Sequence, residues 1–179
     1  MATTRYFAYG SNMDSSTLCG RRGIHYLRAT AGVVRGWRLA LDKPSLLGLP
    51  ESMATIVADE AAEVWGVLYE IAAADLEHLE LTEGVLLGHY QNIQVLVDPR
   101  PSGNGISSPP VDAMTLASDH RDPSLRPSRR YMGLLLAGAL EHGLPSQWVE
   151  HLRSVDAVEE SPQSLAMRGF IDSVLSRQR

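Results

Sequence analysis

The chain has one cysteine, Cys19, in 179 residues, and this scarcity excludes an internal disulfide. A chain without disulfides suits a reducing compartment, so the sequence predicts a cytoplasmic protein. Long hydrophobic runs are also missing, since no stretch reaches the roughly 18 apolar residues that cross a bilayer. Residues 1–5 lead into a strand pattern rather than into the apolar core of an export signal. We therefore expect no membrane partner.

Clustered positive charge is missing too, because the net charge is −5. Residues 1–50 hold seven basic and two acidic residues, whereas residues 51–98 hold ten acidic residues and no lysine or arginine. No segment has the basic clustering that a nucleic-acid surface requires, so no nucleic-acid partner is expected. The contrast predicts that the N-terminal and central segments lie side by side with their charges paired or solvated. The alternative is an acidic docking surface.

Several catalytic patterns are absent. The six histidines show no close pair such as H-x-x-x-H and have no cysteine companions, so we expect no metal site. Ser11 is a poor nucleophile candidate because the chain lacks a G-x-S-x-G elbow. Cys19 is interpreted as a packing residue. Four arginines lie in a polar segment with few aromatics and are expected to serve surface solubility rather than phosphate binding: Arg121, Arg126, Arg129 and Arg130.

Strand-like segments come first and helix-like segments last, which predicts an α+β protein. The length fits a single domain over 1–179, with a C-terminal helical extension from about residue 156. Strands are expected near 5–9, 33–41, 53–58, 64–71, 90–97 and 111–116, the fourth being central because it is almost continuously apolar. Gly36 and Gly66 indicate bulges or bends that curve a sheet. Helices are expected at 73–81, 129–142, 145–155 and 162–176, and a surface loop at 99–110.

The most informative segment runs from Tyr6 to Met13, with the sequence YFAYGSNM. A β-prone stretch leads directly into Gly10-Ser11-Asn12, which suits a tight turn. The backbone N–H groups of such a turn can hold a carboxylate or a developing oxyanion. The alternative is an ordinary strand-to-helix turn in which Asn12 or Asp14 caps the helix, and the two interpretations are compatible.

Glu83 is the candidate catalytic carboxyl. Its sequence neighbours are largely apolar: Leu79, Leu81, Val85, Leu86 and Leu87. Desolvation by such neighbours would favour a carboxyl that takes and returns a proton near neutral pH. The alternative is a solvent-facing residue at the end of a helix. Tyr90 and Tyr131 are expected at the edge of the core on local grounds.

Four segments, in order, resemble the gamma-glutamylcyclotransferase family. Residues 6–13 look like its signature loop, and residues 63–69, EVWGVLY, resemble its central strand. Residues 83–90, EGVLLGHY, are similar to the segment with its catalytic glutamate. Residues 127–131, PSRRY, and 141–145, EHGLP, look like its C-terminal helical pair. The resemblance spans about residues 5–152.

The resemblance implies a small mixed β-barrel of about six strands with flanking helices. It also implies an enzyme of glutathione metabolism that converts a γ-glutamyl amide to 5-oxoproline and a free amine. Glu83 would be the general acid and base, and the remaining site residues would bind substrate: Tyr9, Gly10, Ser11, Asn12, Tyr90 and Tyr131. The substrate's own α-amine is the nucleophile, so no cofactor is needed. We expect a monomer or homodimer.

Three alternatives stay open at this point. The leaving group could be an alkylamine, a γ-glutamyl-lysine remnant or a protected intermediate of secondary metabolism. The chain could also be a non-catalytic binding module that kept the pocket. Hydrolysis through an activated water would release glutamate instead of 5-oxoproline.

Overall fold

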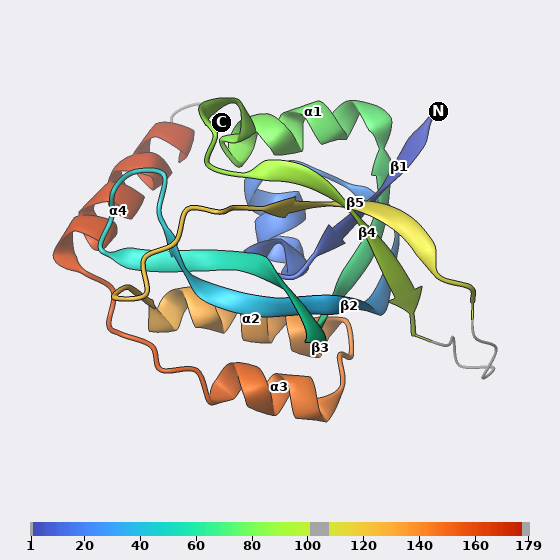
Figure 1. Ribbon diagram of the computed structural model, residues 1–179. Coiled ribbons are helices and arrows are strands. Elements are labelled where there is room, and N and C mark those ends of the chain that lie inside the picture. Colours follow the sequence, from blue (N-terminus) through green and yellow to red (C-terminus); the bar gives the residue numbers. More distant parts are fainter. Residues whose placement is uncertain (1, 101–107, 177–179) are drawn as a thin grey trace.

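The structure is a computed structural model that describes residues 2–100 and 108–176 (Figure 1). Its strands are β1 (Thr3–Ala8), β2 (Tyr26–Pro44), β3 (Glu51–Ala72), β4 (Gln91–Pro99), β5 (Val111–Ala117) and β6 (Arg126–Pro127). Its helices are α1 (Ala73–Thr82), α2 (Arg129–Glu141), α3 (Ser146–Arg153) and α4 (Pro162–Ser176). The predicted α+β class is confirmed. The loop expected at 99–110 falls mainly on residues 101–107, outside the described residues.

The sheet closes into a barrel because β1 has two neighbours. The strand order is β1-β5-β4-β2-β3-β6, and β1 also pairs with β3, which joins the ends of a five-strand ring. The β1–β5 pair is parallel and the other pairs of the ring are antiparallel. The predicted mixed barrel is therefore confirmed. Two of the expected strands, 53–58 and 64–71, form one continuous strand, β3, and the short β6 adds a strand that the sequence did not indicate.

The β2–β3 hairpin places the basic N-terminal segment against the acidic central one, as predicted. Arg35 pairs with Glu63 at 3.8 Å and Arg38 pairs with Asp59 at 3.7 Å. The expected bulge at Gly36 is confirmed, because the register shifts between Arg35 and Trp37 and Gly36 has a φ of 80°.

Gly66 shows no bulge, so the expectation was wrong there. It pairs in register with Gly32 across the hairpin. A Cβ atom at Gly66 would lie 2.3 Å from the carbonyl oxygen of Ala8. The glycine is therefore required by the close approach of β1, not by a bend.

The core fills the barrel and the space beneath the helices. The strand expected to be central is buried on both faces, since Val64, Val67, Tyr69 and Ile71 in β3 are inaccessible. In Figure 1, α2 and α3 lie on one side of the barrel and α1 on the opposite side. The hydroxyl of Ser128 caps α2 by accepting a hydrogen bond from the N–H of Tyr131 at 3.1 Å. Among the described residues, no helix has both the length and the apolar character needed to traverse a bilayer.

Candidate active site

A cavity of about 220 Å³ lies where the turn after β1 meets the end of α1, the β2–β3 hairpin and the start of α2. It is lined by every residue that the sequence predicted for the site: Tyr9, Gly10, Ser11, Asn12, Glu83, Tyr90 and Tyr131. These residues come from segments as far apart as residues 9 and 131, so only the fold brings them together. The structure thus assembles the predicted residues around one space.

Glu83 is held in this cavity by two polar side chains. Asn12 Nδ2 donates a hydrogen bond to Glu83 Oε1 at 2.7 Å, and Arg22 forms an ion pair with the same oxygen at 2.8 Å. Arg22 Nε also donates to Asn12 Oδ1 at 2.7 Å, which closes a ring of three side chains. The Glu83 and Arg22 side chains are only 15% and 18% exposed, so solvent screens this contact weakly. The guanidinium and amide together fix the orientation of the carboxylate.

The apolar surroundings expected for Glu83 are not observed. Leu81, Leu86 and Leu87 are 61%, 80% and 72% exposed, so they do not shield the carboxyl. The reason is local geometry: Glu83 ends α1 as its C-cap, and Gly84, with a φ of 72°, turns the chain outward. Neighbours in sequence therefore diverge from the carboxyl, and polar groups from residues 12 and 22 take their place.

The Gly10-Ser11-Asn12 segment forms one turn of 3-10 helix, Ser11–Met13. The N–H groups of Met13 and Asp14 close it onto the carbonyls of Gly10 and Ser11. The amides that begin such a turn have no partner within it. Asp14 then caps the next helical segment, accepting from the N–H of Thr17 at 2.9 Å. Asp14 therefore acts as a cap, as one interpretation expected, and the turn lines the cavity. Anion binding by the turn amides stays a prediction.

Three tyrosine hydroxyls are fixed by backbone atoms around the cavity. Tyr90 donates to the carbonyl of Ala54 at 2.7 Å, and the Ala54 N–H donates to the Tyr131 hydroxyl at 3.1 Å. Tyr9 donates to the carbonyl of Leu116. Burial raises the pKa of Tyr131 to about 12 and the pKa values of Tyr9 and Tyr90 well above their usual range. All three are neutral phenols at physiological pH, shaping the cavity without adding charge.

The sequence did not predict several polar residues of the cavity, among them Tyr6, Arg22, Lys43 and Arg130. Tyr6 lies on β1, two residues before Ala8. Side chains two apart on a strand point to the same face, so the alternation could have placed Tyr6 on the face of Ala8. It accepts a hydrogen bond from Asn12 at 2.9 Å. Arg130 was expected at the surface; it is exposed, yet it borders the cavity. For Arg22 and Lys43 nothing local marked the role, because their partners are distant in sequence.

Among the described residues, no group of three or more histidine, cysteine, aspartate or glutamate side chains could hold a metal ion. The groups that the cavity offers are hydrogen-bond donors and acceptors, one carboxylate and the cations around it.

Comparison with known proteins identifies the family. The model of the AIG2-like family matches residues 63–152. A gamma-glutamylcyclotransferase of Mus musculus is 30% identical over 165 residues, covering 88% of this chain and 81% of the mouse protein. The Homo sapiens gamma-glutamylcyclotransferase is also 30% identical, and the match covers 84% of this chain and 78% of the human protein. A solved gamma-glutamyl cyclotransferase superposes with a TM-score of 0.74 at 23% identity, covering 93% of this chain and 98% of that structure.

The chain therefore belongs to the AIG2-like family, whose model covers half of it. The chain belongs to the gamma-glutamylcyclotransferase family within that group. The family inferred from the sequence motifs and the predicted class of enzyme, a gamma-glutamyl cyclotransferase, are confirmed.

Proposed function

We propose that the cavity binds a γ-glutamyl amide or peptide and releases 5-oxoproline and a free amine. The substrate's α-amine attacks its own γ-carbonyl carbon, a five-membered ring closes, and the C–N bond to the leaving amine breaks. Well-oriented intramolecular reactions reach effective molarities of about 10⁵–10⁸ M, so folding the glutamyl chain back onto itself supplies much of the rate.

One contact supports this proposal above the others: the 2.7 Å hydrogen bond from Asn12 to Glu83. It joins the turn after β1 to the carboxylate after α1, so an anion-binding turn and a proton acceptor face one small space. A γ-glutamyl group presents an α-carboxylate, an ammonium and an amide within a few bonds. The turn amides suit the carboxylate or the oxyanion, and Glu83 suits the ammonium.

In the resting site the contacts with Arg22 and Asn12 hold the Glu83 carboxylate in place to accept a proton. Glu83 therefore begins as the general base and removes a proton from the α-ammonium. Once protonated, the same group has a proton to return to the departing nitrogen. Tyr9, Tyr90 and Tyr131 line the space in which the substrate folds.

The test is the Glu83→Gln variant, which keeps the shape and removes the base. General acid–base catalysis contributes about 10²–10⁴-fold, so we expect a loss of that size in 5-oxoproline formation from γ-glutamyl-alanine. Glu77→Gln is the matched control, because it removes the same charge from an exposed position on α1. Near-full turnover by Glu83→Gln would reject the proposal.

Product analysis separates the remaining readings. The proposed reaction gives 5-oxoproline, hydrolysis gives free glutamate, and a binding module gives neither while still holding the ligand. A panel of γ-glutamyl amino acids, alkylamides and γ-glutamyl-lysine then ranks the leaving groups.

The wider expectations remain part of this proposal: a cytoplasmic enzyme of glutathione metabolism, active as a monomer or homodimer. No cofactor or metal is expected, because the nucleophile belongs to the substrate. No nucleic-acid partner is expected, because no segment has clustered basic residues. The single cysteine supports the reducing compartment.

A further inference from the structure

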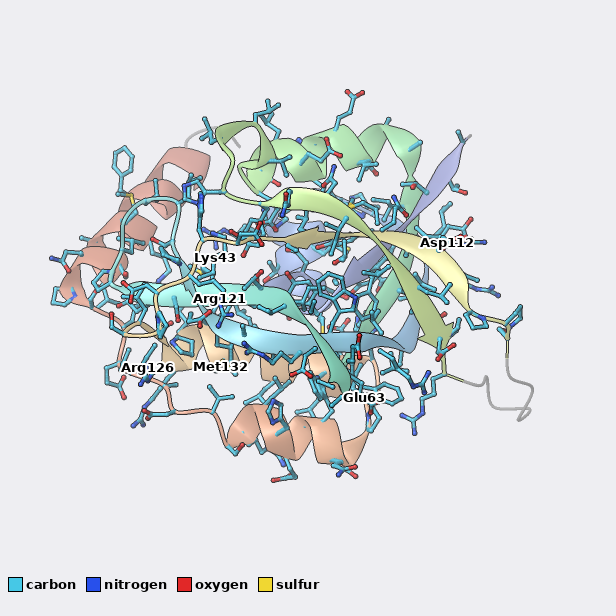
Figure 2. The ribbon with its side chains drawn as sticks, in the orientation of Figure 1. Lys43, Glu63, Asp112, Arg121, Arg126 and Met132 are labelled. Atoms are coloured by element: carbon cyan, nitrogen blue, oxygen red, sulfur yellow. The ribbon has the colours of Figure 1, made fainter. Side chains whose placement is uncertain are left out.

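Lys43 is the single lysine of the chain and is 1% exposed. It lies near the end of β2 (Figure 2). It lines the same cavity as Glu83. Lysine is almost never fully buried unless paired, since removing an ammonium from water is costly. Glu83 is the sole carboxylate among the described residues that line the cavity, and it already pairs with Arg22. The buried ammonium thus has no carboxylate of its own there.

The ammonium of Lys43 makes three contacts of weak or moderate strength. Nζ donates to the carbonyl of Pro44 at 2.9 Å, approaches His89 Nδ1 at 3.4 Å, and lies 4.3 Å from the centre of the Tyr90 ring. Burial lowers the pKa of Lys43, although Glu83 acts in the opposite direction. A lysine in such surroundings gives up a proton more readily than a lysine in water.

His89 connects Lys43 to the surface. Its ring lies 6.4 Å from that of His120, which is exposed, and His89 itself is half-buried. Burial, and then the charge of Lys43, lower the pKa of His89, so its imidazole is neutral and able to accept a proton. The pair Lys43–His89 therefore forms a chain of titratable groups from the cavity toward solvent.

The proposed reaction, on which this inference rests, moves more than one proton. The α-ammonium loses two protons to become the ring N–H, one before attack and one after it. The leaving nitrogen gains one proton as the C–N bond breaks and a second to become an ammonium. A single carboxylate would have to change state twice in each turnover.

We propose that Lys43 is the general acid that protonates the leaving nitrogen, with His89 returning a proton to it from solvent. The Lys43 N–H proton passes to the leaving nitrogen as the electron pair of the C–N bond moves there. Glu83 takes the first proton of the α-ammonium and releases it to solvent, and the second proton leaves the α-nitrogen for solvent water after the new C–N bond has formed. Lys43 is left as a neutral amine and recovers a proton through His89. The released amine takes its second proton from solvent. Protons balance over the cycle.

The test combines Lys43→Met with three substrates. γ-Glutamyl-alanine and γ-glutamyl-alanine amide have basic leaving amines and differ in one carboxylate, whereas γ-glutamyl-p-nitroanilide has a weakly basic leaving nitrogen. We expect kcat/KM to fall by about 10²–10⁴-fold for both alanine substrates and by less than about tenfold for the anilide, because its much less basic leaving nitrogen depends less on an enzymatic acid and can take its proton from water.

Lys43→Arg separates acid catalysis from charge. Arginine keeps the cation but cannot be deprotonated in proteins, so it should be as impaired as Lys43→Met. Arg38→Met, an exposed change on the same strand, is the control. Replacing a buried ammonium by methionine is often neutral or stabilising, so thermal unfolding should show both Lys43 variants folded.

A defect confined to γ-glutamyl-alanine and repaired by Lys43→Arg would overturn the proposal and make Lys43 a carboxylate anchor. An equal defect with all three substrates would also overturn it.

His89→Ala should slow steady-state turnover but spare the first turnover. A His89→Ala variant with the steady-state rate of the wild type would overturn the relay. If the wild-type protein forms no 5-oxoproline from any substrate, the proposed function itself fails.

Discussion

At the scale of single residues, the site depends on one guanidinium with three partners. Arg22 contacts both Asn12 and Glu83, and it also donates to Thr82 at 3.0 Å. Its five N–H donors in a fixed plane suit this role, whereas a lysine offers a single point of charge. Arg22 is therefore a positioning residue, because it orients the carboxylate.

Arg22→Met should lower kcat/KM for γ-glutamyl-alanine by about 10²-fold, since small displacements of a catalytic group cost rates of that order. In the Glu83→Gln background the same change should cost little more, because a residue that acts through Glu83 has no effect once the carboxylate is gone. Arg28→Met is the control, as Arg28 is exposed on β2. A full further loss in the double variant would show that Arg22 does not act through Glu83.

The sequence identified Glu83 and the turn but not what surrounds them. Both carry local signals: a carboxyl at the end of a helix, and Gly-Ser-Asn after a strand. Arg22 lies 61 residues from Glu83, and Lys43 lies 46 from His89. A contact across such a separation leaves no periodicity or spacing to detect. The chemistry could be anticipated, whereas the side chains that tune it could not.

At the scale of elements, helix α2 supports the turn from behind. Gly138 packs against it so closely that a Cβ atom would lie 2.5 Å from backbone and side-chain atoms of Met13. Tyr131, on the same helix, reaches the cavity from the other end. The position of α2 is therefore coupled to the position of the turn.

Two glycines of α2 give a matched prediction. Gly138→Ala should destabilise the protein by about 1–3 kcal/mol through overpacking and reduce activity by displacing the turn. Gly133→Ala should stabilise it by about 0.5–1 kcal/mol, because Gly133 is exposed with open space and alanine favours helix. Urea unfolding of both variants tests the pair. Equal effects would mean that the Met13 contact is unimportant.

Helices were predicted from sequence more accurately than strands. Local signals mark a helix, such as Ser128 as a cap and Pro162 as a first residue, and α4 begins and ends where expected. In contrast, residues 26–32 of β2 were not predicted and β3 was divided in two. Their extent is set by pairing along a hairpin of 19 and 22 residues, which single-strand patterns do not encode.

At the scale of the whole molecule, the chain after residue 156 is bound to the barrel at its hairpin. The buried carboxylate of Glu51, at the start of β3, accepts from the N–H of Ser161 and the hydroxyl of Ser164. Burial would raise the pKa of Glu51, but these hydrogen bonds outweigh it and hold the pKa below its usual value. The charged form is therefore the one that fixes α4 to β3.

The sign of the pH effect follows from this lowered pKa. Stabilisation by Glu51 is fully present above the unfolded-state value of about 4.3 and is lost as pH falls through the lower folded value. Glu51→Gln should therefore cost about 1–3 kcal/mol at pH 7. The gap to wild type should shrink below about pH 4.

Urea unfolding across this pH range measures the gap, with Glu60→Gln as an exposed control on the same strand. A gap that stays constant down to pH 3 would contradict a role for the charged carboxylate.

The parallel pairing of β1 with β5 has a consequence for biosynthesis. The opening strand sits between β3 and β5, and Thr115 donates from β5 to the carbonyl of Phe7. During synthesis, β1 can pair with β5 only after the ribosome has released the chain to about residue 117. A nascent polypeptide therefore closes the ring, and completes the cavity beside it, through a contact between segments translated 108 residues apart.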